Sequence, residues 1–400
     1  MTDRDGATLR IGLLTGADDL SYALGITMAL AERGVGLDFI GSDQVDAPEL
    51  HRTPRVRFLN LRGDQSTRAS LPRKVQRIGA YYLRLMAYAA KAGVPVLHIL
   101  WNNKFEFFDR TVLMLYYRAL GRRVVLTAHN INAAKRDGRD NALNRLTLRI
   151  QYRLCDRIFV HTQRMRDELQ TDFSIPAERI AVIPFGINNT TPTTAVTGDE
   201  TRRRLGLAGG DRVMLFFGQI APYKGLEYLI EALPQAFAAD PALRLVIAGK
   251  VKNGSEDYWG RIDRGLRAPE LASRVLRRIE HIPDRDVELY FKAADVLVTP
   301  YVHIFQSGVP FLAYSFGLPV IATDVGALRD DIVEGRTGLL CRPRDPEDLC
   351  RAIAEHFASD LYTEPQRTRA DIRDYANERH SWGKVAAISE AAYRAALNGH

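Results

Sequence analysis

Glycine, small and basic residues come at the end of an apolar run at 213–218, and residues of these types at this spacing could bind a phosphate. The segment Gly218–Gly225 (GQIAPYKG) lies between VMLFFG and LEYLIEAL. A glycine directly after a strand allows a tight turn and a close approach of the backbone. The start of the next helix offers unpaired N–H groups to an anion, and Lys224 can add a positive charge for a diphosphate. Taken alone, the segment could also be a surface loop with a solvated lysine.

Two further segments place small residues between a strand and a helix in the same way. Gln306–Val309 (QSGV) follows VLVTPY, and Thr323–Asp331 (TDVGALRDD) follows PVIAT. Small residues at a helix start can cradle phosphate oxygens, and Ser307 is also a good N-cap. Asp330 and Asp331 could orient ribose hydroxyls, although acids at a helix start often only favour the helix dipole. We predict that these corners converge on one pyrophosphate.

Short β-branched runs alternate with longer amphipathic stretches along the chain, which is the pattern of βαβ units. We therefore predict an α/β fold of two Rossmann-like, doubly wound domains that face a central cleft, where such sheets bind ligands. The predicted strands lie at 9–15, 37–40, 56–61, 95–100, 123–129, 157–162, 180–184, 213–218, 243–249, 275–282, 296–300, 319–323 and 337–341. The clearest helices of the first half are predicted near 20–33, 71–92, 105–120, 141–154 and 163–171.

A polar, Thr-rich segment separates the two halves and predicts the domain boundaries. We place an amino-terminal domain at 1–187, a linker at 188–211 with a short helix near 198–205, and a second domain at 212–378. The last segment, 379–400, is predicted to form a helix that packs back on the first domain. This architecture alone also fits a dehydrogenase or a periplasmic-type binding protein, so the motifs must decide.

The order and spacing of the motifs are more specific than any single one. The second half contains LFFGQIAPYKGLEYLIEAL, LRLVIAGK, AADVLVTPY and QSGVPFLAYSFGLPVIATDVGALRDDIVEGRTGLLCRPRDPEDL, and the first half contains VVLTAHN, DRIFVHT and IAVIPFGIN. This series resembles glycosyltransferase family 4 of the GT-B superfamily. The resemblance implies that the second domain binds a nucleotide sugar and the first an acceptor. It also implies transfer with retention of anomeric configuration and no metal or other cofactor.

The resemblance further implies roles for individual residues of both domains. His129, in the TAHN block, would lie near the donor sugar and its phosphate, and Lys224 would bind the donor diphosphate; these two are the candidate catalytic residues. Without the resemblance, His129 would be interpreted as a core or loop histidine. The candidate donor-binding residues are Gly16, Gly186, Gly218, Gln219, Lys224, Gln306, Ser307, Gly308, Val309, Gly326 and Asp330. The candidate acceptor-binding residues are Asp18, Asp19, Trp101 and Asn102.

The chain departs from the family pattern at three positions of the donor site. Gln219 stands where the family usually has arginine, and Ile304 and Leu312 stand where it commonly has two glutamates. Those glutamates normally hold donor sugar and ribose hydroxyls, so the identity of the donor stays open. UDP- and GDP-linked donors, and glucose, galactose, mannose and rhamnose, are all compatible with the sequence. Gln306 and Ser307 could take over the sugar or phosphate contacts.

Positive charge is concentrated in the first half of this 400-residue chain, whose net charge is +7. Residues 51–91 hold ten Lys and Arg and one acid, Asp64. Within them, LPRKVQRIGAYYLRLMAYAAK is typical of an amphipathic helix. We predict that its basic and tyrosine residues contact an anionic membrane, although a merely solvated face is the alternative; nucleic acid is disfavoured because no recognition module accompanies the patch. The predicted membrane contacts are Arg73, Lys74, Arg77, Tyr81, Arg84 and Lys91.

The remaining features indicate a cytoplasmic protein that is peripheral at the inner face of the cell membrane. No apolar run approaches the length of a membrane span, the amino terminus does not resemble a signal peptide, and three cysteines lack metal-ligand spacing. We expect a retaining transferase that moves a hexose from a nucleotide diphosphate to a lipid-linked or saccharide acceptor. One alternative is a non-catalytic sugar-nucleotide-binding protein or a partner subunit of another transferase. Another is a phosphorylase or hexose-6-phosphate-type synthase with soluble substrates.

Overall fold

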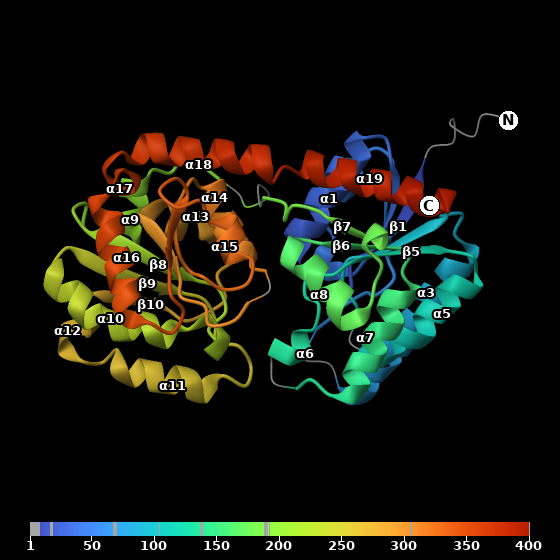
Figure 1. Ribbon diagram of the computed structural model, residues 1–400, viewed down its shortest axis with the longest axis horizontal. Helices are drawn as coiled ribbons and strands as arrows, with labels where there is room; N and C mark the ends of the chain where they lie inside the picture. The colour runs from blue at the N-terminus through green and yellow to red at the C-terminus, as the bar shows by residue number, and fades with distance from the viewer. Residues whose placement is uncertain are drawn as a thin grey trace. The chain divides into compact units, whose positions relative to one another are not determined.

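The computed structural model describes residues 9–16, 19–66, 70–103, 105–136, 139–187, 191, 193–304 and 306–399. The chain divides into two compact units, each built on its own parallel sheet (Figure 1). Unit 1 comprises Met1–Gly186 and Ser381–His400, and unit 2 comprises Ile187–His380. The predicted α/β architecture of two parallel-sheet domains is therefore confirmed.

Unit 1 contains a seven-stranded sheet in the order β3-β2-β1-β4-β5-β6-β7, with parallel pairing throughout. The order reverses between β1 and β4, and such a switch point is where doubly wound sheets bind ligands beyond the carboxyl ends of their strands. The strands are β1 (Arg10–Leu14), β2 (Gly36–Gly41), β3 (Val56–Asn60), β4 (Val96–Ile99), β5 (Arg123–Thr127), β6 (Arg157–Val160) and β7 (Ile180–Val182).

Helices cover both faces of this sheet, and the carboxy-terminal helix α19 packs beside α1 although the two are far apart in sequence (Figure 1). A buried hydrogen bond also joins α19 to the sheet, because the Tyr393 hydroxyl lies 2.7 Å from Nδ1 of His98 on β4. The helices are α1 (Leu20–Glu32), α2 (Pro48–Arg52), α3 (Leu71–Lys91), α4 (Glu106–Phe108), α5 (Met114–Ala119), α6 (Ala133–Arg136), α7 (Ala142–Leu154), α8 (Gln163–Phe173) and α19 (Trp382–Asn398).

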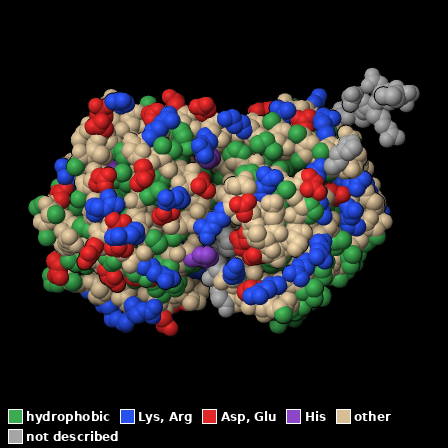
Figure 2. Space-filling model, viewed as in Figure 1, with side chains coloured by type: hydrophobic (Ala, Val, Ile, Leu, Met, Phe, Trp, Pro, Cys, Tyr) green, Lys and Arg blue, Asp and Glu red, His purple; other side chains and the backbone are tan. Residues whose placement is uncertain are grey.

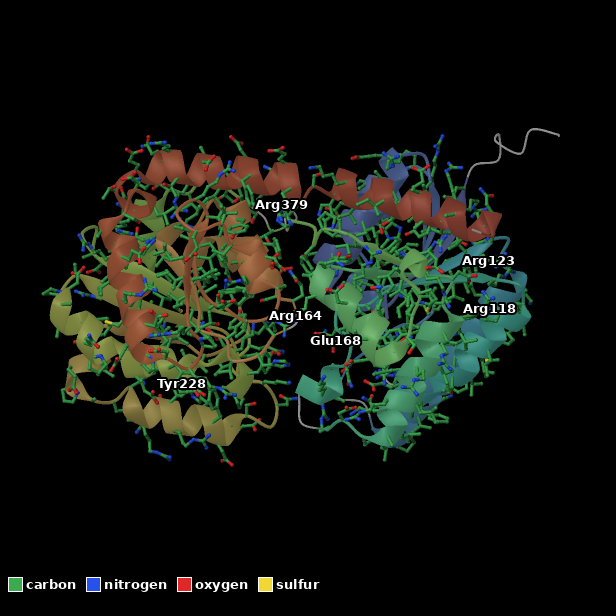
Figure 3. All side chains as sticks on the ribbon, in the orientation of Figure 1. Arg118, Arg123, Arg164, Glu168, Tyr228 and Arg379 are labelled. Carbon is green, nitrogen blue, oxygen red and sulfur yellow. The ribbon has the colours of Figure 1, made fainter. Side chains whose placement is uncertain are left out.

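The amino-terminal end of β5 is held by the carboxylate of Asp156. It accepts a hydrogen bond from the Val124 N–H at 2.8 Å and forms ion pairs with Arg118 and Arg123 at 2.6 and 3.1 Å. The two arginines lie close together at this end of the unit (Figure 3). This cluster lies at the amino-terminal ends of the strands, opposite the edge at which a doubly wound sheet binds its ligand.

Unit 2 contains a six-stranded parallel sheet in the order β10-β9-β8-β11-β12-β13, with its switch point between β8 and β11. Apart from the edge strand β10, its strands are largely buried, as expected for a parallel sheet covered on both faces. The strands are β8 (Arg212–Phe217), β9 (Leu243–Ala248), β10 (Val275–Arg278), β11 (Val296–Thr299), β12 (Val320–Thr323) and β13 (Gly338–Cys341). The helices are α9 (Gly198–Leu205), α10 (Leu226–Ala239), α11 (Glu256–Gly265), α12 (Pro269–Ala272), α13 (Asp284–Ala293), α14 (Gly308–Ser315), α15 (Leu328–Asp331), α16 (Pro346–Ala358), α17 (Asp360–Thr363) and α18 (Pro365–Arg379).

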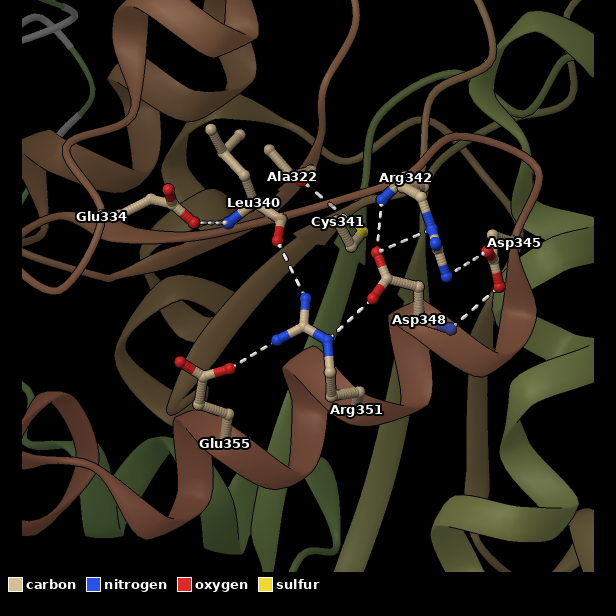
Figure 4. A network of polar contacts seen from close by, with 9 residues as sticks. All are labelled: Ala322, Glu334, Leu340, Cys341, Arg342, Asp345, Asp348, Arg351 and Glu355. Carbon is tan, nitrogen blue, oxygen red and sulfur yellow. Dashed lines mark hydrogen bonds and ion pairs between the residues drawn. The ribbon is translucent and has the colours of Figure 1, made fainter.

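The start of α16 shows how local polar contacts connect a helix to the neighbouring strand (Figure 4). Asp345 caps the helix by accepting from the Asp348 N–H at 2.9 Å. Asp348 in turn accepts from the backbone N–H of Arg342 and from Nε of Arg351, both at 2.7 Å. The helix therefore begins where the sequence supplies an acidic cap followed by Pro346.

One predicted helix is interrupted. The segment expected to be helical over 105–120 consists of α4, a π-helical turn at Asp109–Leu113, and α5. A π turn adds one residue to the helical repeat and often marks a functional site. Here the turn buries the side chain of Asp109.

Candidate functional site

Two glycine loops of unit 2 are pressed against the segment that follows β11. Gly225 and Gly326 have φ values of +61° and +56°, a conformation that side chains disfavour. A Cβ atom at Gly225 would lie 2.0 Å from the carbonyl oxygen of Pro300, and one at Gly326 would lie 1.8 Å from that of Ile304. Only glycine therefore lets the loops after β8 and β12 approach the loop after β11 so closely.

Tyr301 connects the lysine and the serine that the motifs single out. Lys224, at the end of a 3₁₀ turn (Pro222–Lys224), is only 6% exposed, and its Nζ lies 3.8 Å from the centre of the Tyr301 ring. This cation–π contact stabilises a charge that burial would otherwise disfavour. The Tyr301 hydroxyl lies 3.4 Å from Oγ of Ser307, and its carbonyl oxygen accepts from the Thr323 hydroxyl at 2.6 Å. Lys224, Ser307 and Thr323 therefore all converge on Tyr301.

The amino terminus of α14 begins at this point. Ser307 is its N-cap, with Oγ accepting from the Val309 N–H at 3.4 Å. A Cβ atom at Gly218 would lie 3.6 Å from Cγ2 of Val309, so the turn after β8 also meets this helix start. The start of a helix presents N–H groups and a partial positive charge, and a cation lies close by. This arrangement suits a phosphate oxygen.

The half-buried Gln306 pairs with the buried Asp331 beside this helix start. The Gln306 side-chain amide donates to Oδ2 of Asp331 at 3.0 Å, while its Oε1 atom is buried without a hydrogen-bond partner. Burial raises the pKa of the Asp331 carboxyl to about 7. Its neighbour Asp330, the residue predicted to bind the donor, is exposed, as is Gln219. Ile304 and Leu312, which replace the family's glutamates, are buried.

The loop after β1 in unit 1 is held against the end of β4. Gly16 has φ +58°, and a Cβ atom there would lie 2.0 Å from the carbonyl oxygen of Trp101. The Trp101 ring stacks on His129 with a centroid distance of 4.5 Å and an interplanar angle of 6°. Three predicted residues, one from each of the loops after β1, β4 and β5, are therefore brought together at the carboxyl edge of the sheet.

A chain of hydrogen bonds determines which nitrogen of His129 can accept a proton. His161 Nδ1 lies 3.4 Å from the carbonyl oxygen of Ile183, which can only accept, so this nitrogen carries the hydrogen. His161 Nε2 must then accept from Nδ1 of His129, 3.0 Å away. The remaining Nε2 atom of His129 is a buried acceptor with no protein partner. Burial, with smaller effects of His161 and His98, lowers the pKa of His129 well below its usual value, so the ring is neutral at pH 7.

Aromatic side chains surround the histidine pair. The Tyr22 ring contacts the rings of His129, Trp101 and Phe185 at centroid distances of 4.7, 5.6 and 5.4 Å, and that of Trp382 at 5.0 Å. A Cβ atom at Gly186 would lie 2.4 Å from Cζ2 of Trp382, so this predicted donor-binding glycine provides the space for the Trp382 ring. Such an apolar wall next to an unpartnered acceptor is typical of small-molecule sites.

The candidate acceptor residues differ in their surroundings. Asp18 lies outside the described residues, whereas Asp19 is the N-cap of α1 and accepts from the Tyr22 N–H at 2.9 Å. The amide of Asn102 pairs with that of Gln151 through two hydrogen bonds of 3.1 and 2.7 Å. The geometry therefore gives Asp19 and Asn102 structural contacts, and Trp101 the position beside His129.

The predicted membrane contact at Tyr81 is wrong. Its side chain is only 5% exposed and its hydroxyl donates to Oδ1 of Asn103 at 2.8 Å, because α3 turns this face toward the core. Arg77 forms an ion pair with Asp64 at 2.9 Å, and Arg84 donates to the carbonyl oxygen of Leu61 at 3.3 Å. The remaining predicted contacts are Arg73 and Lys91, which are exposed, and Lys74, which is half-buried.

Within the described ranges, no group of three or more His, Cys, Asp or Glu side chains is arranged to hold a metal ion. Among the same residues, no helix combines the length and the apolar character needed to cross a bilayer.

Tyr301, Tyr22 and His161 were not predicted from the sequence, although Tyr301 organises the site in unit 2 and the other two organise the site in unit 1. Tyr301 lies at the end of a predicted strand and Tyr22 within a predicted helix, where aromatic residues usually belong to the core. His161 stands in the block DRIFVHT. Its position at the end of a strand neighbouring that of His129 was the available signal.

Each unit is a doubly wound parallel sheet with a candidate site at its switch point. Two such units in one chain are the architecture of the GT-B glycosyltransferases. Two family models match the chain: "Glycosyltransferase Family 4" over residues 21–190 and "Glycosyl transferases group 1" over residues 211–359. The chain belongs to glycosyltransferase family 4.

Relatives of the chain are named as glycosyltransferases. A D-inositol 3-phosphate glycosyltransferase of Geodermatophilus obscurus is 31% identical over 250 residues, 60% of this chain. The chain spans about half the length of such relatives, 53% for that protein. A protein of the same name from Thermobispora bispora is 27% identical over 94% of this chain and 89% of its own.

Solved structures share the fold over nearly the whole chain. Sucrose-phosphate synthase from Thermosynechococcus elongatus has a TM-score of 0.77 at 21% identity, covering 98% of this chain and 100% of that one. The Anabaena protein HepE in complex with UDP and glucose has a TM-score of 0.72 at 17% identity, with the same coverages. At these identities the likeness defines the fold alone.

Proposed function

We propose that this protein is a retaining glycosyltransferase that transfers a hexose from a nucleotide diphosphate to a lipid-linked or saccharide acceptor. It acts at the cytoplasmic face of the cell membrane and requires no metal. One observation carries the proposal: the buried Lys224 cation and the Ser307-capped start of α14 meet on the same tyrosine ring. Named relatives that transfer glycosyl groups, and a HepE structure that contains UDP and glucose, agree with a nucleotide sugar donor.

In this proposal, unit 2 stabilises the leaving diphosphate. Breaking the bond between the sugar C1 and the phosphate oxygen develops negative charge on the diphosphate. Lys224 and the N–H groups at the start of α14 are already oriented, so they stabilise that charge more than the ground state. The sugar C1 then forms its new bond with the acceptor oxygen, and the acceptor proton passes to the released diphosphate.

In unit 1, His129 binds a sugar hydroxyl. Its Nε2 atom is an acceptor without a protein partner, and the low pKa keeps it unprotonated at neutral pH. A hydroxyl group is the simplest hydrogen-bond donor for this nitrogen. Trp101 stacks on a face of the imidazole ring and keeps the ring in place. The site thus matches a polyhydroxylated ligand better than a nicotinamide cofactor.

The proposal is tested by a thermal-shift screen of nucleotide sugars, because a ligand of the folded state raises the melting temperature. The screen compares UDP- and GDP-linked hexoses, each with and without EDTA. At least one should raise the melting temperature equally well with EDTA present. The same donor is then incubated with acceptors, and NMR of the product should show retained anomeric configuration. Binding of no nucleotide sugar would overturn the proposal.

A non-catalytic nucleotide-sugar-binding protein or partner subunit is the second candidate function. Ile304 and Leu312 favour it, because both are buried apolar residues where the family commonly has carboxylates. The two candidates differ in turnover. Donor binding without release of the nucleoside diphosphate, with every acceptor class tested, would favour the non-catalytic protein, whereas any acceptor-dependent release excludes it.

A further inference from the structure

A groove of about 380 Å³ lies beside the amino-terminal half of α3, in unit 1. We call it the α3 groove; its walls come from α3 and from Arg62, Gln65, Ser66, Asn103 and Phe105. Its apolar lining includes Leu71, Val75, Ile78 and Phe105. This volume falls within the range of roughly 300–1,000 Å³ that is typical of small-molecule sites. Neither the phosphate site nor the histidine pair contributes a side chain to it.

Basic side chains line the rim of the α3 groove. Arg62, Lys74 and Arg77 border it, and Arg77 is neutralised by its ion pair with Asp64. Arg62 donates to Oδ1 of Asn103 at 2.7 Å and lies over the Tyr81 ring at 4.9 Å, which fixes its position. Both contacts are with neutral groups, and the Arg62 charge also acts on the nearby buried Asp109 carboxyl. Lys74 forms no ion pair with a described side chain, so its charge remains for an anionic ligand.

The floor of the groove is a rigid polar network. Asn103 accepts from Tyr81 and donates its amide to Oδ1 of Asp109 at 3.0 Å, and the Tyr82 hydroxyl donates to the same oxygen at 2.9 Å. The π-helical turn places Asp109 here, and its Oδ2 atom is buried without a partner. These contacts keep Tyr81, Tyr82 and Asn103 in place, so the groove is already formed without a ligand.

Apolar side chains of the groove are exposed at the surface of unit 1. Leu71 and Val75, which line it, are 74% and 63% exposed. Within the described ranges, the large apolar side chains that are strongly exposed all lie between residues 71 and 146 of unit 1. Figure 2 shows green hydrophobic and blue basic side chains together over the region that Figure 1 labels α5 and α7. Exposed apolar groups mixed with basic ones are typical of a surface that meets lipid. The others are Leu83, Phe105, Phe107, Val112, Leu115, Leu143 and Leu146.

We infer that the α3 groove binds one lipid molecule with an anionic phosphate head group. The hydrocarbon chain lies along Leu71, Val75 and Ile78, and the phosphate lies between Arg62 and Lys74. The inference rests on the proposed function, in which it narrows the acceptor to the lipid-linked class. A free phosphate would not need the apolar walls, and a flat membrane surface would not need a concave site with a fixed floor.

Binding of a single lipid is tested with geranyl phosphate, kept below the concentration at which it aggregates. Titration calorimetry of the whole chain should show saturable binding with one site. Geraniol, which lacks the charge, and inorganic phosphate, which lacks the chain, should each bind at least tenfold more weakly. Equal binding of inorganic phosphate would instead define a free-phosphate site. Binding to anionic vesicles alone would define a membrane surface. Both results overturn the inference.

Variants on α3 separate the groove from the surface around it. Val75→Asp and Lys74→Glu should each weaken binding of geranyl phosphate at least tenfold. Leu83→Asp is the matched control, because Leu83 is a 71% exposed apolar residue of the same helix that does not line the groove. Equal losses in Val75→Asp and Leu83→Asp would indicate unspecific partition and overturn the inference. Circular dichroism checks that each variant is folded.

Donor binding is measured in parallel, so that the two proposals fail separately. If nucleotide sugars bind and turn over but geranyl phosphate does not bind, the groove inference is wrong and the proposed function stands. If geranyl phosphate binds to the groove but no nucleotide sugar does, the proposed transferase function is wrong. Val75→Asp should bind the donor as the unmodified chain does, since residue 75 belongs to unit 1 and the phosphate site to unit 2.

Discussion

The protonation of His129 is determined by the groups behind it. His161, fixed by the Ile183 carbonyl, requires Nδ1 of His129 to donate, which leaves Nε2 as an acceptor. We predict that His129→Ala lowers kcat by about tenfold, the value of one neutral hydrogen bond. His161→Phe, which removes the acceptor, should cause a similar loss, and His161→Gln, which retains one, should restore most of it. Steady-state kinetics checks this; a His161→Phe enzyme with unchanged kcat would contradict the tautomer assignment.

Asp331 should make stability depend on pH near neutrality. The pKa of its carboxyl is about 7 in the folded chain, against 3.8 for an unperturbed aspartate, so the folded chain binds the proton more tightly. Folding stability is therefore greatest below pH 4 for this group and is lost as pH rises through 7. Asp331→Asn should be more stable than the unmodified chain at pH 8, by up to about 4 kcal/mol, and similar at pH 4.

Urea unfolding at several pH values measures this difference in the free energy of unfolding. Asp330→Asn is the matched control, because that neighbouring carboxyl is exposed and should show little effect. A constant difference between Asp331→Asn and the unmodified chain from pH 4 to pH 8 would show that Asp331 ionises normally.

At the scale of elements, α19 can pack on α1 because Gly25 of α1 has no side chain. A Cβ atom at Gly25 of α1 would lie 2.1 Å from Cε2 of Trp382. We predict that Gly25→Ala lowers the free energy of unfolding of unit 1 by about 1–3 kcal/mol, because overpacking displaces the indole ring. Gly79→Ala on α3, where nothing lies within 4 Å of the new Cβ, should instead stabilise by about 0.5–1 kcal/mol. Thermal unfolding followed by circular dichroism distinguishes the two; stabilisation by both would contradict the contact.

Strands were more predictable from sequence than the contacts between loops. Every predicted strand is present within a few residues, because a parallel strand buried on both faces is a continuous apolar run. The π-helical turn at Asp109 had no such signal, since one extra residue leaves the apolar pattern on both sides intact. The sequence also did not show which of Asp330 and Asp331 is buried. Consecutive residues of a helix point about 100° apart, so the answer depends on how the helix is rotated against the sheet.

The site was predictable in part for the same reason. The small residues after strands mark the loops, so Lys224 and Ser307 were identified from local spacing. Which side chain connects them depends on tertiary contacts, and the motif does not specify that Tyr301 turns its ring toward Lys224. Likewise, an amphipathic helix predicts two faces, but the burial of Tyr81 depends on Asn103 of another loop.

At the scale of the whole molecule, buried histidines should make unit 1 the more acid-sensitive part. Burial lowers the pKa of His98 to about 3 and of His161 to about 4, and that of His129 falls in the same direction. Unit 2 buries His356, with a pKa of about 4. Above pH 6.5 these histidines are neutral in both the folded and the unfolded chain, so their burial costs no stability. As the pH falls from 6.5 toward their lowered pKa values, the unfolded chain binds protons first and the folded state loses stability.

Tryptophan fluorescence can follow the two units separately during an acid titration. Trp101 and Trp382 belong to unit 1, and Trp259 belongs to unit 2. With Trp259→Phe the signal reports unit 1, and with Trp101→Phe and Trp382→Phe together it reports unit 2. We predict that unit 1 unfolds at the higher pH. Loss of unit 2 first would show that other groups dominate the acid response.

The most direct test of the account is the affinity of the donor for Lys224→Met, measured by titration calorimetry with the nucleotide sugar found in the screen. Loss of a charge-assisted contact of about 1.5–3 kcal/mol predicts that the Kd of the donor rises roughly 10- to 100-fold. Arg264 is an exposed cation on α11, so the control Arg264→Met should leave the Kd unchanged. An unaltered Kd in a folded Lys224→Met variant would contradict the assignment of the diphosphate to this corner of unit 2.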